Sequence, residues 1–150
     1  MEQRRGVADM TEFDKCLQMF KMQEGIAAAT AVLDDEELRI GVAAWSTMPV
    51  KMKPDIDSDA KPDTNNIHEQ WAWLWEQVSF DIALFGLVAG VEKHRAVALF
   101  TRLMTLRLIY PDGEISSLAA AYMGQYARKK VGLKDRPPEK KNNKKKGQGD

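Results

Sequence analysis

The apolar residues between positions 67 and 85 recur every three or four positions, which is the spacing of one face of an α-helix. Asn66 directly precedes this stretch and is a favourable N-cap residue. The repeating residues are Ile67, Trp71, Leu74, Trp75, Val78, Ile82 and Phe85. The pattern predicts one long central helix with a wide apolar face, so the chain must find packing partners for that face.

Two segments before this stretch carry helical signals of their own. Residues 11–24 place Phe13, Leu17 and Phe20 on one stripe, and Thr11 can cap that helix. Acidic residues at 34–37 favour the start of a second helix, because negative charge is stabilising at a helix N-terminus. We expect this second helix to continue to about residue 47, before Pro49.

A third periodic stretch follows the central one, over residues 91–110. Gly86 and Gly90 lie between the two patterns, and their spacing lets helices approach closely. We therefore expect the central stretch and residues 91–110 to form a hairpin or one bent rod.

A turn and a final helix complete the periodic part of the chain. Residues 110–113 read Tyr-Pro-Asp-Gly, which is the chemistry of a type I turn. A helix is then expected from Ile115 or Ser116 to Gly132, which is placed to end it. Its expected buried stripe consists of Ile115, Leu118, Tyr122 and Tyr126.

These patterns predict an all-α protein, a helical bundle or hairpin core with long central helices. No convincing period-two pattern is present, although a short strand that we cannot place is compatible with the sequence. The predicted organisation is a flexible N-terminus (1–10), a helical core (11–132) with a polar, mobile loop at 49–64, and a disordered basic tail (133–150).

Charge is distributed unevenly along the chain. Residues 128–150 contain ten Lys/Arg and three Asp/Glu, whereas residues 1–127 contain 12 Lys/Arg and 19 Asp/Glu. A basic segment gains affinity for DNA by releasing counterions from phosphates, without reading base sequence. The alternatives are a solubility tail or simple compensation of a helix C-terminus by residues 128–130.

We interpret this charge as a contact with nucleic acid. The predicted DNA-binding residues are the cations of residues 91–110 and of the C-terminal region: Lys93, Arg95, Arg102, Arg107, Arg128, Lys129, Lys130, Lys134, Arg136, Lys140, Lys141, Lys144, Lys145 and Lys146. Anionic membranes are a weaker fit, because the tail contains no large apolar residue to insert.

The Trp-rich stretch predicts contact with a second subunit. On one helix, Trp71 and Trp75 share a face while Trp73 points elsewhere, so two surfaces need covering. A neighbouring helix of the same chain or another subunit could cover the second surface, and aromatic residues are enriched at interface centres. The predicted oligomer interface is Trp71, Trp73, Trp75, Val78, Ile82 and Phe85.

No motif in the sequence specifies a reaction, so we expect no enzyme and no cofactor. The acidic stretch from Asp55 resembles a calcium loop but lacks the required Gly and Glu and contains Pro62. His68 and His94 have no ligands at zinc spacing, so no metal site is predicted. A single Cys16, no signal peptide and no membrane-spanning segment together predict an intracellular protein.

The order of elements resembles the small terminase subunits of tailed bacteriophages. The segment that carries the resemblance is residues 106–119, Leu-Arg-Leu-Ile-Tyr-Pro-Asp-Gly-Glu-Ile-Ser-Ser-Leu-Ala, within a general likeness over residues 10–132. The resemblance implies a non-catalytic, helical, ring-forming homo-oligomer in the host cell cytoplasm. Such a protein recognises viral DNA and regulates the large terminase subunit during genome packaging.

One departure from that family matters for the site. Many small terminases place a DNA-binding helix-turn-helix at the N-terminus, but residues 11–48 of this chain are acidic. DNA contacts are therefore expected at the cations of residues 93–107 and in the tail. The alternative hypothesis is a helical adaptor whose acidic body binds a basic partner and whose tail is incidental.

Overall fold

Thr11, Asp35, Asn66 and Ser116 each accept a hydrogen bond from the first turn of the helix that they precede, so these four helices begin where the sequence predicts. The Thr11 side chain also forms a capping box with Asp14. The computed structural model describes residues 10–57 and 59–134. The elements in these ranges are α1 (Glu12–Met22), α2 (Ile26–Thr30), α3 (Glu36–Trp45), β1 (Lys51–Met52), α4 (Ile67–Glu76), β2 (Val78–Ser79), α5 (Ile82–Ala89), α6 (Lys93–Thr105), α7 (Ser117–Tyr122) and α8 (Gly124–Lys130).

The described residues are mostly helical, in agreement with the predicted all-α class. The strands are two residues long and pair antiparallel, with Lys51 opposite Ser79 and Met52 opposite Val78. The expected loop at 49–64 thus contains β1. The predictions for residues 1–9 and 135–150 lie outside the described residues.

The prediction of one long central helix is wrong. α4 ends at Glu76, β2 follows at Val78–Ser79, and α5 then begins at Ile82. Asp81 starts α5, because its carboxylate accepts hydrogen bonds from the backbone N–H groups of Ala83 (3.0 Å) and Leu84 (3.2 Å). The apolar spacing continues across the break, so periodicity alone did not reveal it.

The last predicted helix is also divided. Gly124 has φ 83°, which separates α7 from α8, and Gly132 (φ 87°) follows α8 near its predicted end. The buried positions are Ala119, Met123 and Ala127, each one residue further along the chain than a member of the predicted stripe. The predicted burial of Tyr126 is therefore wrong, since this side chain is 58% exposed.

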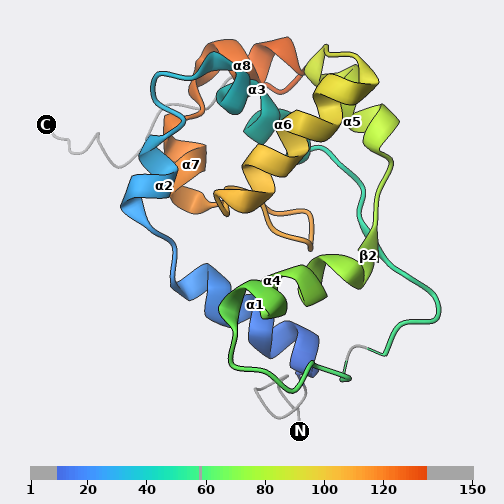
Figure 1. Cartoon of the computed structure of the whole chain (residues 1–150). Helices are drawn as coiled ribbons and strands as arrows, with labels where there is room; N and C mark the ends of the chain where they lie inside the picture. Colours follow the sequence, from blue (N-terminus) through green and yellow to red (C-terminus); the bar gives the residue numbers. More distant parts are fainter. Residues whose placement is uncertain (1–9, 58, 135–150) are drawn as a thin grey trace, which may run out of the picture.

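The elements form two lobes (Figure 1). The lower lobe consists of α1 and α4, and the upper lobe consists of α2, α3 and α5 to α8, with α3 packed against α5, α6, α7 and α8. The lower core contains Phe13, Leu17, Phe20, Trp71, Trp73, Leu74 and Tyr110. The upper core is built around Val42, Trp45, Phe85, Leu99 and Leu103.

Tryptophan side chains join the lobes. The indole N–H of Trp71 donates to the carbonyl of Met104 at the end of α6 (3.0 Å), and that of Trp45 donates to the carbonyl of Tyr110 (3.2 Å). The rings of Trp45 and Trp75 pack with their centroids 5.5 Å apart. The upper lobe is therefore held to α4 by both hydrogen bonds and ring contacts.

Candidate nucleic-acid interface

α5 and α6 are joined by the short turn Gly90-Val91-Glu92. Gly90 has φ 78°, a left-handed conformation that glycine adopts without steric cost. Its N–H donates to the carbonyl of Leu87 (3.2 Å), and the N–H of Val91 donates to that of Gly86 (2.9 Å). This pattern is a Schellman motif, which ends α5 and redirects the chain into α6.

Small residues let α5 and α6 touch. A Cβ atom on Gly86 would lie 2.9 Å from the Cβ atom of Ala96 and 3.0 Å from the carbonyl oxygen of Val91. Phe85, Gly86 and Ala89 are buried on the α5 side, as are Ala96 and Leu99 on the α6 side. The close approach predicted from Gly86 and Gly90 is thus present, and it fixes how α6 crosses α5.

The outer face of α6 is left uncovered by the described part of the chain. Its exposed residues are Lys93, His94, Arg95, Val97, Ala98, Thr101, Arg102 and Thr105. Two helices joined by a short glycine-containing turn form an αα-hairpin, and the second helix of a DNA-binding helix-turn-helix also presents a free face. A helix is about 10–12 Å in diameter with its side chains, which fits a major groove about 12 Å wide, and the 13 residues of α6 extend about 20 Å along the helix axis.

Two of the predicted DNA-binding arginines are paired with carboxylates of α3. Arg95 forms an ion pair with Glu37, and Arg102 pairs with Asp35 (3.1 Å) and approaches Glu37 (3.8 Å). Burial acts to raise the pKa of Asp35, but hydrogen bonds from the Leu38 N–H and the Arg102 guanidinium outweigh it and lower that pKa. The carboxylate of Asp35 is therefore held in its charged form beside Arg102.

Lys93 and Arg107 lie at opposite ends of α6, about 20 Å apart along its axis. Lys93 is exposed and forms no hydrogen bond or ion pair with any residue that the structure describes. Arg107 follows the helix, with φ 60°, and its guanidinium lies 4.8 Å from the ring centroid of Phe20 and 5.8 Å from that of Trp71. Arg107 thus contacts the lower lobe, and Lys93 is free to meet a ligand.

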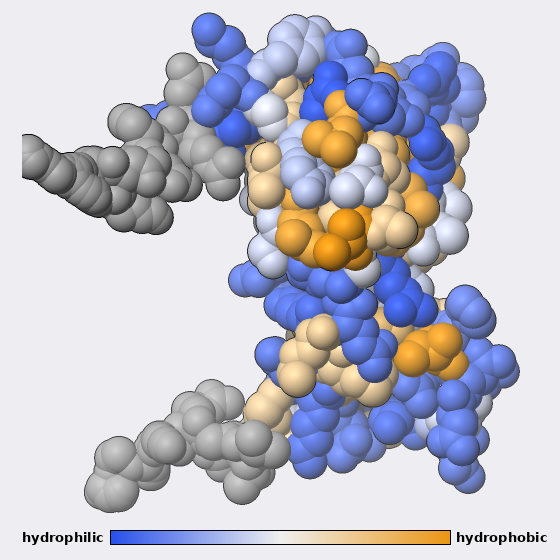
Figure 2. All heavy atoms as spheres, turned by 90° about the vertical axis from the view of Figure 1, so that its left-hand side faces the viewer, coloured by the Kyte–Doolittle hydropathy of each residue, from blue (hydrophilic) through white to orange (hydrophobic). Residues whose placement is uncertain are grey.

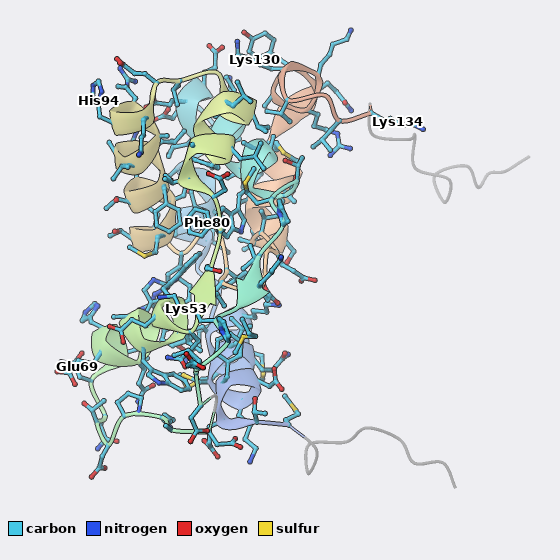
Figure 3. All side chains as sticks on the ribbon, turned by 90° about the vertical axis from the view of Figure 1, so that its right-hand side faces the viewer. Lys53, Glu69, Phe80, His94, Lys130 and Lys134 are labelled. Carbon is cyan, nitrogen blue, oxygen red and sulfur yellow. The ribbon has the colours of Figure 1, made fainter. Side chains whose placement is uncertain are left out.

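The basic end of α8 lies beside the turn between α5 and α6. A Cβ atom on Gly90 would be 3.7 Å from the Lys130 Cε and 3.9 Å from its Nζ. Figure 3 shows His94, Lys130 and Lys134 at the same end of the molecule, away from Lys53 and Glu69 of the lower half. Arg128 instead donates two hydrogen bonds to the carbonyl of Lys134 (3.0 and 2.8 Å).

The structure therefore brings part of the predicted DNA-binding set together. Lys93 and Lys130 both lie at the turn between α5 and α6, and Lys129 belongs to the same last turn of α8 as Lys130. Predicted residues that lie outside the described residues are Arg136, Lys140, Lys141, Lys144, Lys145 and Lys146. Sequence reasoning did not single out Val97 and Thr101, and it counted Ala98 with the apolar repeat of residues 91–110, although Ala98 is exposed and shares a helix face with the other two.

The predicted oligomer interface lies largely inside the chain. Trp71, Trp73, Val78 and Phe85 are buried, while Trp75 and Ile82 are half-buried. Helix α1 covers the first two, with ring centroids of Phe20 and Trp71 4.9 Å apart and of Phe13 and Trp73 6.2 Å apart. The apolar surplus that motivated this interface is thus covered within one chain, and assembly itself stays a prediction.

Apolar surface is exposed elsewhere. Figure 2 shows apolar residues gathered on the upper lobe, over the side where Figure 1 places α2. Ile26 of α2 is 69% exposed. A surface for protein contact is therefore available on α2 rather than on the Trp-rich helix.

A polar cleft of about 330 Å³ lies where the two lobes meet. Glu24 on its wall accepts hydrogen bonds from the Tyr110 hydroxyl (3.1 Å) and from the Ser117 N–H and hydroxyl (both 3.2 Å). Burial, followed by the charge of Glu24, raises the pKa of Tyr110 well above its usual range. These contacts tie α1 to the turn after α6 and account for the polar groups structurally.

Other classes of site were also considered. Among the residues that the structure describes, no group of three or more His, Cys, Asp or Glu side chains is arranged to hold a metal ion. In the same part of the chain, every helix is too short or too polar to cross a bilayer. Comparison with protein-family models, curated proteins and solved structures found no match to this chain.

Proposed function

We propose that this protein binds double-stranded DNA by placing α6 in the major groove. The observation that carries the proposal is the α5–α6 crossing, in which Gly86 meets Ala96 and Gly90 forms the turn. This packing buries the inner side of α6 and leaves its outer face free. In a helix-turn-helix the second helix enters the major groove in this way.

The distribution of charge supports the same orientation. Lys93 and Lys130 both lie at the turn between α5 and α6, and the ten Lys/Arg of residues 128–150 begin beside this turn. Phosphates beside the groove would attract these cations. In this arrangement α6 supplies the base contacts and the C-terminal region supplies affinity that does not depend on sequence.

The finer part of the proposal concerns the biological role. The resemblance to phage small terminases supports a homo-oligomeric ring that recognises viral DNA and regulates the large terminase subunit. Several copies would present several basic tails together, and multivalent attachment raises affinity without new contacts. Light scattering with and without DNA measures this assembly directly, and a monomer at micromolar concentration would remove the ring from the proposal.

The experiment for DNA binding is a titration of a labelled duplex of about 25 base pairs at low salt, followed by fluorescence anisotropy. Ala98→Glu places a carboxylate on the outer face of α6, whereas Ala72→Glu makes the same change on an exposed position of α4. We expect Ala98→Glu to weaken binding by roughly tenfold or more, since a like charge opposes the phosphates, and Ala72→Glu to stay within about twofold.

Deletion of residues 133–150 separates the two contributions. The deletion should lower affinity and reduce the dependence on salt, while the effect of Ala98→Glu persists. Equal binding by Ala98→Glu and Ala72→Glu would contradict the placement of α6. Absence of binding by the full chain at low salt would favour the adaptor hypothesis instead.

A further inference from the structure

The groups that α6 offers to base edges follow from its contacts with α3. Arginine is the side chain that most often reads guanine, through two hydrogen bonds to its major-groove edge. Both arginines of α6 are engaged elsewhere, because Arg95 pairs with Glu37 and Arg102 pairs with Asp35. The side chains of Arg95 and Arg102 remain about half exposed, so the two arginines lie at the border of the free face of α6. There each guanidinium is held by a carboxylate of α3.

The centre of the free face is uncharged. Val97 is 46% exposed, and Ala98 and Thr101 are also exposed. The hydroxyl of Thr101 donates to the carbonyl of Val97 (2.8 Å), so its proton is used within the helix. These three residues therefore present mainly methyl groups to a molecule that binds the free face. Their side chains are small, so the helix can approach that molecule closely.

We propose that α6 recognises thymine methyl groups, so that the preferred DNA carries A·T base pairs opposite Val97, Ala98 and Thr101. In the major groove, thymine is distinguished by its C5-methyl group, and small apolar side chains contact that group. Asp35 and Glu37 are positioning residues in this account, because they keep the guanine-reading arginines away from the bases. The inference rests on the proposed DNA binding and specifies which DNA is bound.

The test begins by selecting bound duplexes from a randomised pool with the full chain. The best duplex is then made with deoxyuridine in place of each thymidine, which removes the C5-methyl group and leaves base pairing and charge unchanged. We expect binding to weaken by roughly fourfold for each methyl group that is contacted, with the same dependence on salt.

Val97→Ala connects this loss to the protein. If Val97 contacts a thymine methyl group, the penalty for deoxyuridine should be smaller in Val97→Ala than in the unmodified chain. Equal affinity for the thymidine and deoxyuridine duplexes would overturn the inference while leaving the proposed function intact. Loss of all duplex binding would contradict the proposed function itself.

The role of the α3 carboxylates is tested with Asp35→Asn combined with Glu37→Gln. Asparagine still caps α3, so the helix start is kept while both charges are removed. Released Arg95 and Arg102 should shift the selected sites toward guanine, and the salt slope should steepen by roughly 0.9 for each new phosphate contact.

The matched control is Asp55→Asn combined with Asp63→Asn, which changes net charge equally at exposed positions between α3 and α4. This control should retain the A·T preference and the original salt slope. An unchanged base preference in the α3 variant, or an equal shift in the control, would overturn the positioning role of Asp35 and Glu37.

Discussion

α1 and α4 of the lower lobe pack through large aromatic rings, whereas α6 of the upper lobe meets α3 and α5 at the small residues Gly41 and Gly86. α1 and α4 meet through Phe13, Phe20, Trp71 and Trp73. In the upper lobe, a Cβ atom on Gly41 would lie 2.8 Å from the Leu103 Cδ1, as close as that on Gly86 lies to Ala96. Large rings bury more area, while small residues dictate how closely and at what angle helices cross.

This difference assigns separate roles to the lobes. Aromatic burial gives the lower lobe and the junction much of their hydrophobic stabilisation, since each ring removes a large area from water. The glycine and alanine contacts of the upper lobe contribute less area but determine the position of α6. Changes at the junction should therefore affect stability most, and changes at the small residues should affect the proposed DNA-binding face of α6.

The largest effect is expected from Trp45→Ala. The Trp45 side chain is fully buried, packs against the rings of Trp75, Phe80 and Phe100, and donates a hydrogen bond to the carbonyl of Tyr110. Its truncation should lower the free energy of unfolding by about 3–5 kcal/mol, measured by urea denaturation. Trp45→Phe keeps a ring and loses the hydrogen bond, so its cost should be clearly smaller. Equal losses would assign the role of Trp45 to its N–H group.

The second effect concerns the small-residue packing of the upper lobe. Gly86→Val inserts a branched side chain where even a Cβ atom is too close to Ala96, so we expect a loss of about 1–3 kcal/mol. DNA affinity should fall as well, because α6 must move. Ala83→Val introduces the same residue at an exposed position of α5 and serves as the control. Similar DNA affinities for the two variants would argue against the role given to the α5–α6 crossing.

The same contrast explains which parts of the fold the sequence could predict. Helix starts depend on local side-chain-to-backbone hydrogen bonds, so Thr11, Asp35 and Asn66 could be identified from their neighbours in the chain. The break after α4 involves the pairing of β2 with β1, which lies more than twenty residues earlier. Such a non-local pairing leaves no mark on the apolar periodicity of residues 67–85.

The site was predictable to a similar extent. Gly86 and Gly90 indicated close helix packing correctly, since the signal is local. The neutralisation of Arg95 and Arg102 depends on α3 lying beside α6, about sixty residues away in the chain. For the same reason, the periodicity of residues 67–85 could not show that α1 covers Trp71, and it left a helix of the same chain and a second subunit as alternatives.

A smaller effect, with a dependence on pH, is expected where Tyr110 joins the lobes. An unfolded tyrosine loses its proton near pH 10, whereas the raised pKa of Tyr110 keeps the folded state protonated to higher pH. The folded state then binds more protons above about pH 10, so stability falls as pH rises from there. Tyr110→Phe should cost about 1 kcal/mol at pH 7 and make this alkaline decline shallower.

Lys21 also contributes to the loss of stability at alkaline pH, so Tyr110→Phe can remove only part of that loss. Burial lowers the pKa of Lys21, but its hydrogen bonds and ion pairs with Asp112 and Glu114 outweigh burial and raise it. Stability from this group is also lost as pH rises beyond 10, so the slope should decrease without vanishing. Urea denaturation between about pH 8 and 11 measures both contributions. An unchanged alkaline slope in Tyr110→Phe would exclude Tyr110 as its source.

The smallest net effect is expected at Arg107, where two opposing contributions meet at the junction. Its left-handed backbone costs about 1 kcal/mol relative to glycine, while its guanidinium gains about as much from lying over Phe20 and Trp71. Arg107→Gly loses the stacking but relieves the backbone, so its stability should stay close to that of the unmodified protein.

Arg107→Ala loses the stacking and keeps the backbone cost, so it should be about 1 kcal/mol less stable than Arg107→Gly. The difference in the free energy of unfolding between these two variants, measured by urea denaturation, reports the cost of the left-handed backbone alone, because neither side chain reaches the rings. If the alanine and glycine variants are equally stable, the chain after α6 does not hold this left-handed conformation, and Arg107 joins the lobes without strain.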